Sequence, residues 1–407
     1  MQVFTFERGE NMLSLHEYES RIDRPVMMKI PEFNRENRLK HILFSSQMDK
    51  MMIDMLCRTA LKIKHISSTK PGSDYLLSLL SHKRAMLYFT QVSTRTFMSF
   101  MAASQILGIK CNEIRDQNLS SEFKGESPLD SIRMFSSYFD VIIMRSKTPN
   151  FAEACAYLMN DLDQFNQRSV PIINAGAGAD EHPTQALLDI FTLQRTFGFT
   201  SKKDSSKWNY YRELKKNHPD LTKGLNDKVY GFCGDLRRGR TVRSLVNLLS
   251  LYENISVAFI SPDSEDFRFP EEEIKRLEHR GVTVYEYFSL DEAIDKVDML
   301  YMTRIQKEYD KPDQSKNYDE LIGEFILTPE RAERLKTYCP ILHPFPRNEE
   351  IPFEIDSNPR AMYFRQARNG MWVRAALIAH LFDVESQIAN YYQDKFSEYH
   401  NYNMEAI

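Results

Sequence analysis

The stretch Ala85–Leu107 constrains the fold of this chain more than any other. It opens as the short apolar run A-M-L-Y-F, which is the pattern of a buried strand. The tetrapeptide S-T-R-T at 93–96 interrupts the run, and apolar residues resume at helical spacing over 97–107. Because hydroxyl residues cap helices well, we expect a buried strand that leads directly into the N-terminus of a helix.

This junction has the chemistry of an anion site. The first turn of a helix presents free backbone amides and the positive end of the helix dipole, both of which favour an anion. The hydroxyls and the Arg95 guanidinium add donors that suit a phosphate oxygen. The alternative is an ordinary helix cap with a surface arginine, and for such a junction taken alone caps are the commoner case.

A second apolar stretch, Tyr138–Met144, also predicts a buried strand, and Arg145 follows it. In open α/β sheets the ligand lies outside the carboxyl ends of the strands. Arg145 is therefore placed to share an anion with Arg95, although an arginine after a strand is more often a surface residue. Strands expected at 229–233, 255–260, 282–288 and 297–303 continue an alternation with helices that is typical of the α/β class.

The segment His182-Pro183-Thr184-Gln185 follows a strand at 170–175 and a loop at 176–180. Pro183 suits the first position of a helix, so His182 is expected at the helix N-terminus, where the dipole disfavours the imidazolium ion. A neutral imidazole can donate one hydrogen bond to a carbonyl oxygen, and Gln185 lies about one turn further on. The alternative is a histidine cap beside a solvated glutamine.

A glycine-rich turn, G-D-L-R-R-G-R-T at 234–241, joins a predicted strand to a helix. It lacks the G-x-G-x-x-G spacing of dinucleotide sites, and its three arginines favour a small anion over NAD. Arg304 follows a later strand at its carboxyl end. In H-P-F-P-R at 343–347, two prolines predict an extended or turning segment that exposes backbone carbonyls.

The remaining chain is less informative. We expect a helix over 47–66, a turn at 70–73, a loop over 111–128 and a closing helix at 365–385. Within that loop, Lys124 beside Gly125 could bring a charge to a ligand, although a solvated surface lysine is the commoner case. The charged segment 201–227 is expected to be a surface excursion, and the tail after 385 to be peripheral.

Composition excludes several classes of function. The net charge of −4 leaves no basic excess for general nucleic-acid binding, so an anionic substrate must be held by locally placed cations. The five cysteines are scattered without a C-x-x-C pair, which argues against a zinc ribbon or a disulfide framework and fits a reducing cytoplasm. Neither a signal peptide nor an apolar run of bilayer length is apparent, so no membrane association is expected.

Eight motifs together resemble the aspartate/ornithine carbamoyltransferase family, and its aspartate branch most closely. They occur in the family's order between about residues 40 and 385: S-T-R-T, S-x-E-F-K-G-E, V-I-I-M-R, H-P-T-Q-A-L-L-D-I-F-T, G-D-L-R-R-G-R-T-V-R-S-L, M-T-R-I-Q-K-E, H-P-F-P-R and R-N-G. The H-P-F-P segment stands where an ornithine site resembles H-C-L-P. A dicarboxylate substrate also calls for a pair of arginines, which Arg240 and Arg304 can supply.

The resemblance implies two doubly wound parallel-sheet α/β domains joined by interdomain helices. It divides the chain into an N-terminal extension at 1–35, a carbamoyl phosphate domain at 36–180 completed by the helix at 365–385, an aspartate domain at 181–364 containing the insert 201–227, and a tail at 386–407. The implied reaction transfers a carbamoyl group from carbamoyl phosphate to the amine of L-aspartate, as in pyrimidine biosynthesis. No metal or organic cofactor is implied.

The family's functional residues can be carried over by motif. The group implied for the phosphate comprises Ser93, Thr94, Arg95, Thr96 and Arg145. The group implied for the carbamoyl moiety comprises Thr94, Arg145, His182 and Gln185. The group implied for aspartate comprises Lys124, Arg240, Thr241, Arg304, Gln306, Phe345 and Pro346. Arg95, His182, Gln185 and Lys124 would take part in catalysis.

The resemblance further implies a homotrimer in which Ser120 and Lys124 serve a neighbouring subunit's active site. A regulatory subunit or a dihydroorotase partner is left open. Two alternatives to aspartate transfer also stay open: a transcarbamylase for a different amine, and a non-catalytic paralogue that serves as an assembly subunit.

Four positions depart from the family's pattern, which usually has Glu at Gln91, Arg at Phe97, Lys at Phe123 and Arg at Tyr309. In aspartate enzymes a Glu–Arg bridge at the places of Gln91 and Tyr309 helps to hold the domains closed. Both partners are replaced here, so no charge is left unpaired. We therefore expect weaker or differently built closure and a lowered affinity for aspartate, with an active site that still functions.

Overall fold

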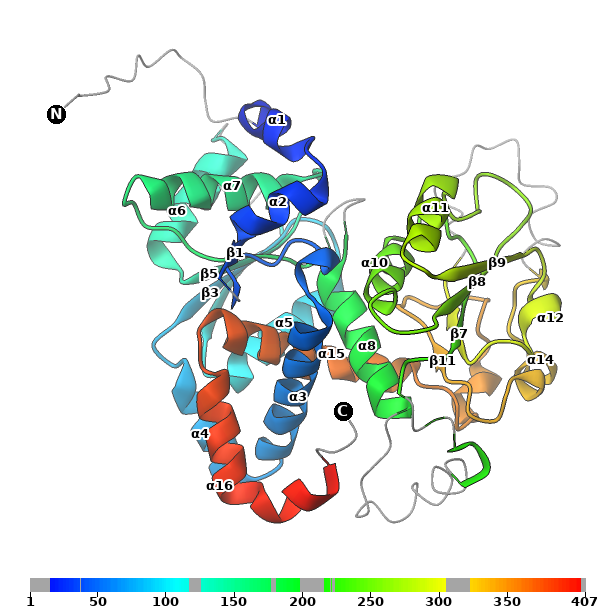
Figure 1. Ribbon diagram of the computed structural model, residues 1–407. Helices are drawn as coiled ribbons and strands as arrows, with labels where there is room; N and C mark the ends of the chain where they lie inside the picture. Colours follow the sequence, from blue (N-terminus) through cyan, green and yellow to red (C-terminus); the bar gives the residue numbers. More distant parts are fainter. Residues whose placement is uncertain are drawn as a thin grey trace.

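The computed structural model describes residues 15–36, 38–116, 126–176, 181–197, 216–219, 221, 224–304 and 323–403. Two parallel sheets lie in separate halves of the molecule, and helices pass between them (Figure 1). This arrangement confirms the predicted fold class of two α/β domains joined by helices.

The amino-terminal sheet has the strand order β4-β3-β5-β6, and every neighbouring pair is parallel. Its strands are β3 (Arg84–Phe89), β4 (Lys110–Ile114), β5 (Val141–Arg145) and β6 (Ile172–Asn174). The strand predicted over 138–144 begins only at Val141, because helix α6 (Pro128–Tyr138) runs on to Tyr138.

Side chains along β3 alternate between two cores, which shows that helices cover both faces of this sheet. Leu87 and Phe89 belong to the core shared with α3 (Lys50–Ile66) and α5 (Thr94–Ile106). Met86 and Tyr88 belong to a separate core, built with α7 (Phe151–Gln164) on the opposite face. Because successive strand residues point to opposite faces, a nearly continuous apolar run is what a doubly covered sheet requires.

The second sheet has the order β11-β10-β7-β8-β9 and is likewise parallel throughout. Its strands are β7 (Val229–Cys233), β8 (Ser256–Ile260), β9 (Thr283–Tyr287), β10 (Met299–Met302) and β11 (Ile341–Leu342). It is associated with α10 (Arg240–Leu249), α11 (Glu271–His279), α12 (Leu290–Ala293) and α14 (Pro329–Arg334).

Helices α8 (Pro183–Phe197) and α15 (Tyr363–Leu381) lie between the two sheets and pack against each other (Figure 1). Helix α15 also contacts α3 and α5, and α8 also contacts α10. One apolar core runs through these helices and includes strand residues of both sheets, such as Leu87 and Phe232. The carboxyl ends of strands in both domains can therefore contribute to one shared site.

Two expectations for the amino-terminal half are wrong. The turn predicted at 70–73 is the first turn of α4 (Lys70–Leu79): the Thr69 hydroxyl accepts a hydrogen bond from the Gly72 amide at 3.1 Å, and Pro71 is tolerated so close to a helix start. The loop predicted from 111 begins instead as the edge strand β4. Its residues are largely exposed and show no apolar pattern, and the strand forms because it pairs with β3.

The tail is not peripheral. Residues 385–403 form helix α16 (Glu385–Asn403), which is kinked at Phe396 and packs against α3. Its Tyr392 is buried and its hydroxyl lies 3.1 Å from Nδ1 of His65, while Tyr391 stacks on Tyr75 with ring centroids 3.9 Å apart. Only a few apolar residues of this helix make the packing contacts, so its sequence shows a weak amphipathic pattern.

The described part of the N-terminal extension is a short helical strap. It comprises η1 (Leu15–Tyr18), α1 (Glu19–Ile22) and α2 (Val26–Phe33), followed by the hairpin β1 (Asn34–Arg35) and β2 (Arg38–Leu39) and the turn η2 (Ser45–Gln47). Lys29 on α2 forms a buried ion pair with Glu153 on α7 at 2.6 Å. The strap is therefore anchored to the amino-terminal domain by charge as well as by apolar contacts.

Candidate active site

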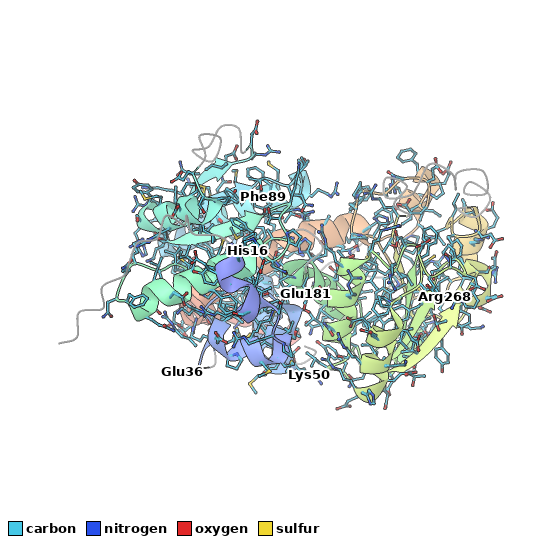
Figure 2. All side chains as sticks on the ribbon, turned by 90° about the horizontal axis from the view of Figure 1, so that it is seen from above. His16, Glu36, Lys50, Phe89, Glu181 and Arg268 are labelled. Carbon is cyan, nitrogen blue, oxygen red and sulfur yellow. The ribbon has the colours of Figure 1, made fainter. Side chains whose placement is uncertain are left out.

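The residues predicted to bind an anion lie where β3 and β5 end side by side. Their register pairs Phe89 with Arg145, and α5 begins at Thr94 after a short connection. The Gln91 amide donates to the Arg145 carbonyl at 3.1 Å, which holds that connection against the end of β5. The S-T-R-T helix start and Arg145 thus belong to the same edge of the sheet, as the sequence predicted. Figure 2 marks Phe89 in this domain and Glu181 where the two domains meet.

Arg145 is only 8% exposed although it carries a guanidinium. Its Nη1 donates to the Ala175 carbonyl at 3.3 Å, and within the described residues its Nε has no hydrogen-bond partner. Burial, and then the positive charges of Arg240, Arg374 and Arg95, lower the pKa of Arg145 to about 9. Three further arginines, drawn from both domains, therefore act on Arg145, an arrangement that a bound anion would relieve.

Arg374 of α15 belongs to this cluster and was not singled out from the sequence. It is 3% exposed, its Nη1 donates to the Ser99 hydroxyl at 2.5 Å, and burial lowers its pKa to about 10. A Cβ at Gly370 would lie 2.5 Å from the same Nη1, so the glycine of the R-N-G motif leaves room for this guanidinium. The signal available in the sequence was one arginine within the apolar run V-R-A-A-L-I-A.

His182 stands directly before α8 and is 4% exposed. Its backbone amide donates to the Ser244 hydroxyl at 3.1 Å, and within the described residues its Nδ1 has no partner. Its pKa lies well below the ordinary value because of burial and then the charges of Arg145, Arg240 and Arg374. A neutral ring agrees with the expectation from sequence, but burial and the arginines are the causes, where the sequence had indicated the helix dipole.

Gly176 determines how closely the backbone approaches this imidazole. It has a φ of +89°, and a Cβ there would lie 2.5 Å from Cδ2 of His182. Glycine is therefore required both by the backbone conformation and by the space. The backbone at Gly176 therefore lies directly against the histidine ring.

Gln185 lies one turn along α8 from His182. Its Nε2 donates to Asp189 at 2.9 Å. Asp189 is fully buried and was not identified from the sequence, although a carboxylate inside the run A-L-L-D-I-F could have drawn attention.

The H-P-F-P segment reaches the cluster from the second domain. Nδ1 of His343 accepts from the Phe345 amide at 2.8 Å, and Nε2 of His343 lies 2.8 Å from the Glu350 carboxylate. The Arg95 guanidinium lies over the Phe345 ring, 5.4 Å from its centroid. The Phe345 amide is thus already bound within the turn, and the binding of a ligand by the carbonyl oxygens of this turn stays a prediction. Pro346 is exposed beside it.

The second domain contributes its own arginines at matching strand ends. Arg240 opens α10 after β7, with Thr241 next to it, and Arg304 lies two residues beyond β10. Strands β7 and β10 are neighbours, with Met302 paired to Cys233, so both arginines lie at the carboxyl edge of this sheet. Ser120, Lys124 and Gln306 of the expected site, and Phe123 and Tyr309 of the departures, lie outside the described residues.

Two of the departures can be located. Phe97 is buried against Phe89, with ring centroids 5.4 Å apart, and the Arg115 guanidinium lies 4.7 Å from its ring centroid. Gln91 has a buried Oε1 that lacks a partner among the described residues. An arginine from elsewhere in the chain thus occupies the space beside Phe97.

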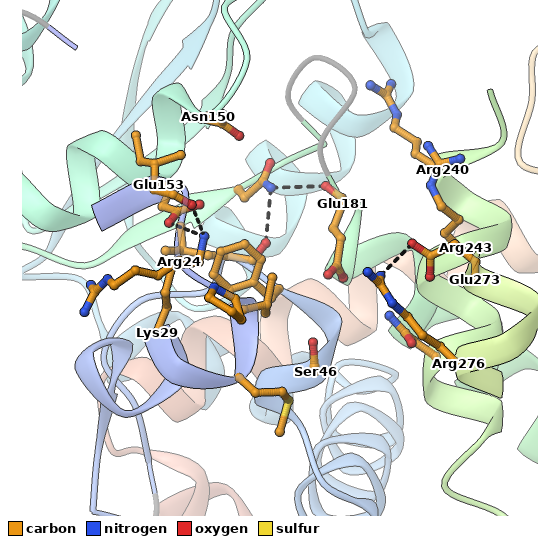
Figure 3. Close-up of a pocket in the computed structure, with 18 of the residues that line it drawn as sticks. Arg24, Lys29, Ser46, Asn150, Glu153, Glu181, Arg240, Arg243, Glu273 and Arg276 are labelled. Carbon is orange, nitrogen blue, oxygen red and sulfur yellow. Dashed lines mark hydrogen bonds and ion pairs between the residues drawn. The ribbon is translucent and has the colours of Figure 1, made fainter. Parts of the chain in front are cut away.

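A pocket of about 640 Å³ lies between the domains, with Arg240 at its edge (Figure 3). Glu181 faces it from the amino-terminal side, and Arg243 and Glu273 face it from α10 and α11. Arg276 pairs with Glu273 at 3.0 Å, so acids and bases are mixed along this wall.

Within the described ranges, no group of three or more His, Cys, Asp or Glu side chains could hold a metal ion. In the same part of the chain, no helix is both long and apolar enough to cross a membrane. Fold and site define a two-domain α/β protein in which arginines from both domains lie around the neutral imidazole of His182.

The comparisons with known proteins agree with this description. The family model for the carbamoyl phosphate-binding domain of aspartate/ornithine carbamoyltransferases matches residues 40–195. The model for the Asp/Orn-binding domain of the same family matches residues 226–381. The chain belongs to the aspartate/ornithine carbamoyltransferase family.

Individual relatives fall in the aspartate branch. The chain is 36% identical over 345 residues to the aspartate carbamoyltransferase catalytic subunit of Methanocaldococcus jannaschii, covering 85% of this chain and 98% of that one. It is 38% identical over 340 residues to the multifunctional protein CAD of Squalus acanthias, covering 84% of this chain but only 13% of that much longer protein.

Solved structures give the same result. The Methanocaldococcus jannaschii catalytic subunit superposes with a TM-score of 0.69 at 33% identity, covering 85% of this chain and 98% of that one. An aspartate transcarbamoylase of Trypanosoma cruzi in complex with N-(phosphonacetyl)-L-aspartic acid has a TM-score of 0.69 at 30% identity, covering 87% and 99% of the two chains.

Proposed function

We propose that this chain transfers the carbamoyl group of carbamoyl phosphate to the amino group of L-aspartate, giving N-carbamoyl-L-aspartate and phosphate for pyrimidine synthesis. The observation that carries the proposal is that the charges of Arg145, Arg240 and Arg374 act on a neutral His182, while Arg95 acts on Arg145. Two anionic reactants can be brought together only where several cations offset their mutual repulsion.

The proposed roles follow from what each group can donate. The start of α5, with Ser93, Thr94, Arg95 and Thr96, together with Arg145, binds the phosphate. The neutral imidazole of His182 donates a hydrogen bond to the carbamoyl oxygen, where negative charge grows as the amine attacks. The tetrahedral species then collapses and phosphate leaves. Holding both reactants in fixed geometry removes up to about 7–11 kcal/mol of the barrier.

Aspartate is the proposed amine because its two carboxylates need two cationic partners. Arg240 and Arg304 come from adjacent strand ends of the second sheet, with Thr241 beside the first. Arg–carboxylate pairs are frequently bidentate and fix orientation as well as affinity. We assign Lys124 and Gln306 to the same substrate, and the carbonyl groups of Phe345 and Pro346 to its amine.

The experiment measures phosphate release from carbamoyl phosphate with a panel of amino acids. We expect turnover with L-aspartate, lost in Arg95→Ala and in His182→Ala. Turnover should be kept in Arg133→Ala, which removes an exposed arginine on α6 that hydrogen-bonds Gln167. Turnover with another amine alone would replace aspartate as the substrate. Binding of carbamoyl phosphate without turnover on any amine would make the chain a non-catalytic paralogue.

We further propose a homotrimer in which Ser120 and Lys124 complete a neighbour's site. Light scattering gives the assembly state. A mixture of inactive Lys124→Ala and inactive His182→Ala chains, refolded together, is expected to regain activity, since some sites then combine intact residues from two chains. A mixture that stays inactive while each variant assembles normally would contradict shared sites.

We place the protein in the cytoplasm, which suits its five free cysteines. A dihydroorotase or a regulatory subunit is the partner to look for, and the former is supported by the similarity to a multifunctional relative. Copurification with the tagged full chain tests both.

A further inference from the structure

Asp189 lies fully buried in the middle of α8, where it accepts three hydrogen bonds from three different elements. Its Oδ1 accepts from Nε2 of Gln185 at 2.9 Å and from Nε2 of Gln366 on α15 at 2.7 Å. Its Oδ2 accepts from the Tyr301 hydroxyl on β10 at 3.0 Å. One carboxylate therefore joins both interdomain helices to the sheet of the second domain.

The first of these bonds fixes the orientation of Gln185. A glutamine amide has a donating NH2 group and an accepting oxygen, and its surroundings decide which of them points where. Because a carboxylate accepts hydrogen bonds, the NH2 of Gln185 is held toward Asp189 and its Oε1 must point elsewhere. Gln185 can thus offer an acceptor to a substrate N–H group, whereas His182 one turn earlier offers a donor.

The second bond connects Asp189, through Gln366, to the turn at His343–Phe345. Gln366 donates to Asp189, and its own Oε1 accepts from the His343 amide at 2.9 Å. His343 in turn accepts from the Phe345 amide through Nδ1 at 2.8 Å. A continuous series of hydrogen bonds therefore runs from Gln185 to the turn at Phe345.

We propose that Asp189 is a positioning residue that orients Gln185 toward the carbamoyl nitrogen and, through Gln366, sets the His343–Phe345 turn that receives the amine. The inference rests on the proposed function, because that function assigns the two ends of the series to the two substrates. Asp189 touches neither substrate. It determines whether their binding groups are aligned with each other.

A purely structural role is less favoured by the energetics of the site. Burial raises the pKa of Asp189 to about 7, even though Gln366, Tyr301, Gln185 and the Arg374 charge act in the opposite direction. A buried carboxylate of this kind costs stability, and apolar residues of similar size often replace buried charges without loss. What an apolar residue cannot do is accept from two glutamines at once.

The test compares Asp189→Leu with Asp189→Asn. The amide of Asn can keep its oxygen toward both glutamines and direct its NH2 toward the Tyr301 oxygen, so we expect kcat within a few-fold of wild type. Leu removes the acceptors, and we expect kcat to fall on the order of 100-fold, since small misplacements cost about that much. The KM for carbamoyl phosphate should change less, because α5 and Arg145 hold its phosphate.

Thr192→Val provides the matched control. Thr192 also lies on α8, and its hydroxyl accepts from Asn369 of α15 at 2.9 Å, so the variant removes a partly buried bond between the same two helices away from Gln185. We expect its kcat to stay within about two-fold of wild type. Equal losses in Thr192→Val and Asp189→Leu, equal losses in Asp189→Asn and Asp189→Leu, or no loss in Asp189→Leu would each overturn the proposal.

A second variant guards against failure of Asp189→Leu to fold. Gln366→Met removes the link to His343 but keeps the size of the side chain, and we expect a lowered kcat with a raised KM for aspartate. A Gln366→Met enzyme with wild-type constants would overturn the proposal. The wild-type chain is assayed alongside: if it does not turn over carbamoyl phosphate and aspartate, the proposed function fails, a result distinct from an active wild type that the variants leave unchanged.

Discussion

At the scale of single residues, the site is built from groups that are unfavourable in isolation. Arg145 and Arg374 are buried cations without an ion-pair partner among the described residues, and Arg145 lies in the field of three further arginines. Such an arrangement is destabilising unless an anion binds, because like charges repel and burial removes their hydration. The protein is therefore preorganised for its anionic ligands at the expense of its own stability.

Removing Arg374 should weaken anion binding. Arg374→Met keeps much of the side-chain volume but loses the charge, and a hydrogen bond to a charged group is worth about 1.5–3 kcal/mol, or roughly 10- to 150-fold in affinity. Calorimetric titration with inorganic phosphate measures the change, and phosphate should raise the melting temperature of the variant less than that of wild type. Arg133→Met is the control, and an unchanged phosphate affinity in Arg374→Met would contradict the cluster.

Asp189 should make stability depend on pH. Its folded pKa of about 7 lies above its ordinary value of 3.8, so between these values the folded state holds a proton that the unfolded state lacks. Wild-type stability should therefore fall, relative to Asp189→Asn, as the pH rises from about 4 to 7, by at most about 4 kcal/mol. Urea unfolding of both proteins across this range measures the difference, and parallel curves would show that the carboxyl group titrates normally.

At the scale of elements, local pattern and tertiary packing disagree at identifiable places. Helix α3 and strand β7 match their predicted positions closely, because long amphipathic and short apolar runs carry their own signal. Strand β4 was missed because its residues are largely exposed, and α4 because proline and glycine at its start resemble a turn. Helix α16 is held by a few aromatic contacts that sequence spacing does not reveal.

Helix α16 should contribute to stability and not to catalysis. Tyr392 is 2% exposed and its ring stacks on His65, so Tyr392→Ala should lower the free energy of unfolding by about 3 kcal/mol. The exposed Gln393→Ala on the same helix should stay within about 0.5 kcal/mol of wild type. Denaturant unfolding measures both, and kcat should be unchanged in each; a loss of activity in folded Tyr392→Ala would contradict this division of roles.

At the scale of the whole molecule, the site exists only because two domains meet. The Arg95 guanidinium of the first domain lies over Phe345 of the second, and Arg240 of the second domain acts on Arg145 of the first. One apolar core continues between the sheets through α8 and α15. The division of the chain after residue 180 and before residue 365 stays a prediction, as does the trimer.

Domain closure should be weaker than in relatives that have the Glu–Arg bridge. Gln91 is neutral, and its buried Oε1 has no partner among the residues that the structure describes. We expect aspartate saturation well above the micromolar range. Initial rates against aspartate concentration measure it, and half-saturation at micromolar aspartate would refute the expectation. Gln91→Glu alone should not raise the affinity for aspartate, whereas Gln91→Glu combined with Tyr309→Arg should raise it.

The sequence by itself determined the α/β class, the strand-to-helix junctions and the set of loops in which the chemistry is predicted, because each of these depends on residues close together along the chain. It identified Arg95, Arg145, His182 and Arg240 for this reason. Only the tertiary structure revealed Arg374 and Asp189, whose roles depend on how α15 crosses α8 and α5. Both charges lie within apolar helices, so most of their partners come from the elements that pack against those helices.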